Sequence, residues 1–153
     1  MANIVFNISK GRAVELYIRV KNSDPANSGL ILIPIETAGL EADAVLVDKE
    51  TVADVLAGTT NEQPAMGRKT LTDAQLAAVP SPDHVNNRYD IALPNVTWTG
   101  ATGAVISKML VAYDPDTTAG SDTTLVPITM FDCALTPDGT DFQLTGATFF
   151  RAA

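Results

Sequence analysis

The chain has 153 residues, a length typical of one domain with a single hydrophobic core. Hydrophobic residues make up 46% of the chain and charged residues only 18%, so much of the surface must consist of Thr, Ser, Asn and Ala. The net charge of -8 argues against nucleic acid or an anionic membrane as a partner, because binding either one requires Lys and Arg to neutralise phosphates. With no apolar run of membrane-spanning length and no signal-peptide pattern at the start, we expect a soluble product of a bacterial-type cytoplasm.

The first third of the chain combines short apolar segments with polar turns. Residues 4–8 alternate in polarity, which predicts an N-terminal strand. Residues 13–20 fit a strand and one face of a helix equally well, so both remain open. Turn-forming residues at 22–29 precede the apolar run 30–35, which predicts a buried strand with Pro34 near a bend or an edge.

The middle of the chain has helical signals. Residues 48–58 begin with acidic residues and end in glycine, which predicts a short helix. Thr72 and Gln75 have capping-box spacing, which predicts a second helix of about two turns. We therefore expect one domain, 1–153, with an exposed excursion of helices and loops at about 40–87.

From residue 88 onward the pattern is almost purely β. It predicts strands at 89–93, 96–99, 104–113, 125–135, 142–144 and 147–151. The Thr-Pro-Asp-Gly sequence at 136–139 predicts a hairpin turn. The expected fold is mainly β: an antiparallel, jelly-roll-like β-sandwich with one or two short helices in the first half.

Residue types that perform catalysis are scarce. His84 is the one histidine and Cys133 the one cysteine, and they stand 49 positions apart in unlike settings. General acid–base and nucleophilic catalysis depend most often on such side chains in close groups. We expect His84 in a surface turn, Cys133 as a small core residue, no catalytic residue, no cofactor and no enzymatic activity.

Three carboxylates in one loop are the weak candidates for a metal site. Asp114, Asp116 and Asp122 could offer oxygen ligands to Ca²⁺, but the loop lacks the glycine and the final glutamate of an EF-hand. We interpret the loop as a solvated turn without a metal. Trp98 on an alternating strand is typical of a core residue; a glycan-binding module would instead expose it.

Five segments together resemble a family of small virion proteins of tailed bacteriophages. They are residues 1–12, 22–28, 88–94 with Trp98, 113–118 and 136–141. The similarity covers nearly the whole chain, and its motifs are turns and strands. The resemblance implies a capsid cement or decoration protein in the virion, β-rich and trimeric, that binds the major capsid protein at the capsid surface. The alternatives are a tail, neck or fibre protein and a glycan-binding jelly-roll module.

Three segments are candidates for the interface with such a partner. Apolar chain ends are often ordered by docking on a neighbour. Arg68 could pair with acidic groups of another subunit. The candidates are Ile4, Phe6, Ile8, Arg68, Phe149, Phe150 and Arg151. The alternative for both ends is that they pair as central strands of one sheet.

Overall fold

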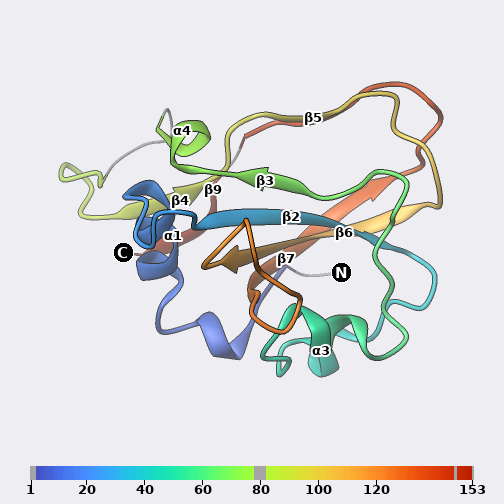
Figure 1. The fold of residues 1–153 in the computed structure, drawn as a ribbon, viewed down its shortest axis with the longest axis horizontal. Coiled ribbons are helices and arrows are strands. Elements are labelled where there is room, and N and C mark those ends of the chain that lie inside the picture. The colour runs from blue at the N-terminus through green and yellow to red at the C-terminus, as the bar shows by residue number, and fades with distance from the viewer. Residues whose placement is uncertain (1–2, 78–81, 147, 153) are drawn as a thin grey trace.

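A five-stranded antiparallel sheet forms the centre of the computed structural model, which describes residues 3–77, 82–146 and 148–152 (Figure 1). Its strand order is β1-β7-β6-β2-β3. The bounds are β1 Ile4–Val5, β2 Gly29–Glu36, β3 Lys69–Leu71, β6 Ile106–Asp114 and β7 Val126–Leu135. Two further pairs form ribbons: β4 Tyr89–Ala92 with β9 Thr148–Ala152, and β5 Val96–Trp98 with β8 Phe142–Leu144.

The central strands β2 and β6 are buried on both faces. Because β2 is apolar at almost every position, Leu30 and Leu32 enter one core cluster while Ile31 and Ile33 enter another. The first cluster includes side chains of α1 and of the two ribbons, and the second includes those of α2 and α3. Figure 1 accordingly shows β5 above the sheet and α3 below it.

Among the described residues, four short α-helices and one 3-10 helix connect the strands. They are η1 Asn7–Ser9, α1 Ala13–Lys21, α2 Asp43–Leu46, α3 Val52–Leu56 and α4 Asp73–Leu76. The ambiguous residues 13–20 thus form a helix, α1. Its buried positions, Ala13, Leu16, Tyr17 and Val20, have helical spacing, and the Tyr17 hydroxyl donates to the carbonyl of Ala92 at 2.9 Å.

The segment from 40 to 77 differs from the expected exposed excursion. Its apolar side chains Leu46, Val52, Val55, Leu71 and Leu76 are buried, and β3 pairs with β2. The Thr72–Gln75 capping box is confirmed, whereas α3 is capped by Thr51 and Asp54 and so begins later than expected. Residues 78–81 lie outside the described residues, and the turn that follows them is exposed.

The mainly β fold with antiparallel pairing is confirmed, but the predicted hairpin at 136–139 is wrong. That turn joins β7 to β8, and β8 pairs with β5 instead of β7. Gly139, with φ of 91°, donates its N–H to the carbonyl of Ala101 at 2.8 Å. The described strands form one five-stranded sheet and two ribbons, so the jelly-roll-like sandwich stays a prediction. The described α-helices are more numerous than the one or two expected.

Candidate interaction surfaces

His84 and Cys133 come from unrelated parts of the fold. His84 is exposed in the turn before β4, and Cys133 is half-buried on β7. Burial raises the pKa of the Cys133 thiol, which reduces the thiolate fraction on which nucleophilic attack depends. Cys133 therefore packs at the margin of the core and is poorly suited to covalent chemistry.

The carboxylates of Asp114 and Asp116 accept hydrogen bonds from the backbone of their own loop. Asp114, buried at the end of β6, accepts a hydrogen bond from the N–H of Asp116 at 2.9 Å, and Asp116 accepts from the N–H of Thr118 at 3.0 Å. Hydrogen bonds from Thr118 lower the pKa of Asp116. Within the described residues, no group of three or more His, Cys, Asp or Glu side chains is placed to hold a metal ion.

Arg68 is bound within its own chain. Its Nη2 lies 2.6 Å from Oε2 of Glu62 and 3.0 Å from Oδ2 of Asp122. Hydrogen bonds to Glu62 and then to Asp122 raise the pKa of Arg68, and the bond from Arg68 lowers the pKa of Asp122. The guanidinium charge is thus already compensated, contrary to the expectation that it would pair with another subunit.

The N-terminal candidates separate into buried and accessible residues. Only Ile4 and Val5 form a strand, and this strand lies at the edge of the central sheet. Phe6 is fully buried in the cluster beneath the sheet, so its place among the interface candidates is wrong. Ile4 and Ile8 are half-buried against the same cluster and keep part of their surface free.

The C-terminal candidates lie in the β4–β9 ribbon, outside the central sheet. Phe149 and Phe150 are half-buried against the core, and Arg151 is exposed. The Nη2 of Arg151 donates to Oδ2 of Asp90 at 3.3 Å, and the hydrogen bonding between these side chains lowers the pKa of Asp90. Phe149 also borders a pocket.

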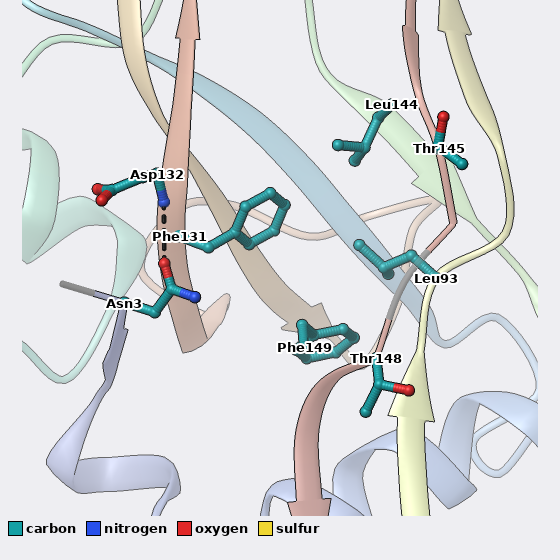
Figure 2. A pocket seen from close by; sticks show the side chains of 8 residues that line it. All are labelled: Asn3, Leu93, Phe131, Asp132, Leu144, Thr145, Thr148 and Phe149. Carbon is teal, nitrogen blue, oxygen red and sulfur yellow. Dashed lines mark hydrogen bonds between the residues drawn. The ribbon is translucent and has the colours of Figure 1, made fainter. Parts of the chain in front are cut away.

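This pocket lies between the exposed side of β7 and the start of β9 (Figure 2). Its volume is about 150 Å³, and its apolar lining consists of Leu93, Phe131, Leu144 and Phe149. Asn3 and Asp132 stand at its edge, where Oδ1 of Asn3 accepts a hydrogen bond from the N–H of Asp132 at 3.1 Å. The fold thus brings residues near both chain ends to one apolar hollow. We name it the β7–β9 pocket.

Trp98 is a core residue. Only 1% of its surface is exposed, its ring stacks on Phe142 at a centroid distance of 5.6 Å, and its Nε1 donates to the carbonyl of Gly67 at 3.0 Å. A glycan platform needs an aromatic face open to solvent. Because Trp98 is buried, its ring has no open face on which a sugar could stack, and the glycan-binding alternative lacks the residue on which it was centred.

A basic groove along α1 is a surface that the sequence-based candidates missed. Residues 10–21 hold four of the ten basic residues of the chain and one of its eighteen acidic residues. Arg12 and Arg19 line a groove of about 310 Å³ together with Glu15, Tyr113 and Val126. The buried Nε of Arg12 has no hydrogen-bond partner among the described residues, while Nε of Arg19 lies 3.0 Å from Oε1 of Glu15. A count of charge along the chain would have found this segment.

The comparisons with known proteins do not assign the chain to a group. No protein-family model matches it, and neither a curated protein nor a solved structure matches it significantly. In the part of the chain that the structure describes, no helix is long and apolar enough to span a membrane.

Proposed function

We propose that this chain is a structural protein of a tailed-bacteriophage virion, a cement or decoration protein that binds the lattice of the major capsid protein and stabilises the head. The resemblance of its turns and strands to small virion proteins supports the role. The structural observation that carries the proposal is the basic groove along α1 on an otherwise acidic protein.

The segregation of charge gives the protein one preferred side for an acidic partner. Arg12 and Arg19 lie seven positions apart along α1, and both border the groove. A carboxylate of a capsid subunit would meet the guanidinium of Arg12 there and would compete with the exposed Glu15 for that of Arg19, whereas most of the remaining surface would repel it. The groove therefore attracts the protein to acidic groups of the lattice and also fixes the orientation in which it binds.

Binding of this kind stabilises a shell through mass action. A protein that binds the assembled lattice and not free subunits adds its binding free energy to the assembled state alone. A contact of about 800 Å² per partner suffices for a specific site, and an oligomeric protein that binds several sites gains further affinity through avidity.

The direct test is sedimentation of the protein with empty capsids assembled from the major capsid protein of the same phage. We expect co-sedimentation at a fixed ratio to capsid subunits and a higher melting temperature of the shell. The double variant R12Q/R19Q should bind at least tenfold more weakly, while K49Q/K69Q, which removes the same charge elsewhere, should bind nearly as the wild type does.

Two results would count against the proposal. Recovery of the protein on purified tails and not on capsids would assign it to another part of the virion. Equal weakening by the two double variants would show that net charge, and not the α1 groove, governs binding.

A further inference from the structure

The carboxylate of Asp114 is almost completely buried, yet one of its two oxygens has no partner in the fold. The residue is only 5% exposed, and its Oδ1 accepts a hydrogen bond from the N–H of Asp116 at 2.9 Å. Within the described residues, Oδ2 accepts no hydrogen bond, although it is not sealed from solvent. Burial of an anion with an unbonded oxygen is unfavourable, and a positively charged ligand would offset that cost.

Asp114 borders a pocket of about 180 Å³ between the central sheet and the loop that joins β6 to β7. This loop is the orange segment between the labels of β6 and β7 in Figure 1. Ile31 and Leu125 give the pocket an apolar floor, and the exposed Thr70 and Ser121 stand at its mouth. Because neighbouring side chains of a strand point to opposite faces, Asp114 lies on the face of the sheet opposite Tyr113 and the α1 groove. We name this site the Asp114 pocket.

The loop holds the carboxylate in place without a ligand. The N–H of Thr117 donates to the carbonyl of Asn27 at 2.9 Å and ties the loop to the turn before β2. Gly120 packs directly against Asp114, so that a Cβ on Gly120 would lie 2.7 Å from Oδ1 and 3.0 Å from Oδ2. A ligand that binds Oδ2 therefore pays little conformational entropy for ordering the site.

Negative charge exceeds positive charge around the Asp114 pocket. Arg68, Asp114 and Asp122 line it, and Glu62 lies 2.6 Å from Nη2 of Arg68. Three carboxylates thus accompany one guanidinium. Glu62 and Asp122 already bind that guanidinium, so it is not directed at Asp114. The ligand that complements this pocket is a cation.

The geometry favours an ammonium over a guanidinium. A guanidinium binds a carboxylate best through two parallel hydrogen bonds, and Oδ1 of Asp114 is already occupied by the N–H of Asp116. An ammonium is a compact charge with three donors, which Oδ2 and the hydroxyls of Thr70 and Ser121 can accept. The apolar floor suits the methylene stem that carries such a charge in lysine.

We propose that the Asp114 pocket binds the ammonium of a lysine side chain presented by a partner protein. The open mouth lets the stem lead out to the backbone of the partner. A cavity of about 150 Å³ holds benzene, so a pocket of about 180 Å³ has room for a chain of four methylene groups. The site lies on another face than the α1 groove and does not depend on the proposed capsid role.

Titration of the isotope-labelled protein with capped lysine, Nα-acetyl-lysine methylamide, followed by NMR, tests the site. We expect saturable shifts of the N–H signals of Gly120 and Ser121, with a dissociation constant in the millimolar range. Capped arginine and capped trimethyl-lysine should bind at least about tenfold more weakly, because the first needs two free oxygens and the second has no N–H to donate. Butylammonium, a free amine of the same length, should bind about as well as capped lysine.

Two matched variants separate the pocket from net charge. D114N keeps the oxygen that accepts from Asp116 and replaces Oδ2 with an amide group, so it should fold as the wild type does and bind capped lysine at least about tenfold more weakly. D116N removes the same charge from the same loop outside the pocket lining, and should bind nearly as the wild type does.

Four results would each overturn the proposal. They are a wild type without saturable binding of capped lysine, equal binding of capped lysine and capped arginine, equal weakening by D114N and D116N, and binding of butylammonium alone. The last result would assign the Asp114 pocket to a free amine instead of a protein partner.

Discussion

The Nζ of Lys108 lies 3.1 Å from Oδ1 of Asp43, although the side chain of Lys108 is completely buried on β6. A second carboxylate, that of Asp132 on β7, lies 3.2 Å from the same nitrogen. Both aspartates keep part of their surface in water, and Lys108 does not. The Asp43–Lys108 ion pair therefore joins α2 to the sheet. The two carboxylates compensate the charge of Lys108, whose burial alone would strongly oppose folding.

Removal of Asp43 should destabilise the protein more than removal of the lysine. We expect D43A to lower the free energy of unfolding by about 2–4 kcal/mol, because it leaves a buried ammonium with one carboxylate fewer. K108M removes the buried charge itself and leaves two carboxylates that water can reach. Urea denaturation measures both changes, with E50A as a surface control expected within about 0.5 kcal/mol of the wild type. A larger loss in K108M would contradict this account.

The contribution of Arg68 to stability should depend on acid pH. Arg68 holds the pKa of Asp122 below its usual value, so this carboxylate stabilises the fold above its unfolded-state pKa of about 3.9. The stabilisation is lost as the pH falls through the lower pKa of the folded state. We expect R68Q to cost about 1–3 kcal/mol at pH 7, and the difference from the wild type to shrink below pH 4 or so in urea denaturation. A difference that stays constant down to pH 2 would show that Asp122 is not involved.

Tyr17 should make the fold sensitive to alkaline pH. Burial raises the pKa of Tyr17 to about 12, with the neighbouring Tyr89 adding to the shift. The unfolded chain loses this proton near pH 10. Stability should therefore fall as the pH rises from 10 to 12, by up to about 3 kcal/mol from this group. Y17F removes the ionisable hydroxyl, so unfolding curves at pH 9 to 11 should show a shallower decline for Y17F. Parallel declines would contradict the assignment.

Two glycines should differ sharply in their tolerance of alanine. Gly103 has φ of 109°, and a Cβ there would overlap the side-chain amide of the buried Gln63. Gly67 also has a positive φ, 72°, but a Cβ there would meet nothing within 4 Å. We expect G67A to cost about 1–2 kcal/mol from backbone strain, and G103A at least about 2 kcal/mol more. Thermal unfolding followed by the fluorescence of Trp98 measures both, and equal losses would refute the steric argument.

Several elements could be predicted because their determinants are local. The Thr72–Gln75 capping box needs only its own four residues. Strands β6 and β7 are long apolar runs with turn residues at their ends. Residues 13–20, in contrast, satisfy the period of a strand and of a helix. Their helical state is chosen by contacts of Leu16, Tyr17 and Val20 with distant strands.

The candidate surfaces also divide into those that a local sequence pattern predicts and those that depend on contacts between distant residues. The basic groove along α1 has a sequence signal, since its four cationic residues fall within one short segment. The β7–β9 pocket has none, because Phe131, Leu144 and Phe149 reach it through strand pairings that no local pattern specifies. Arg68 was a reasonable interface candidate until the fold placed Glu62 and Asp122 around it.

The amino-acid sequence alone determined the mainly β character, the scarcity of catalytic residue types and the acidic net charge, since each is a property of composition or of neighbouring residues. Only the tertiary structure decided that β8 pairs with β5, that Phe6 and Trp98 are buried, and that Phe131 and Phe149 line one pocket. The physical reason is that strand partners and burial depend on the packing of residues far apart in the chain, and several pairings satisfy the same local preferences equally well.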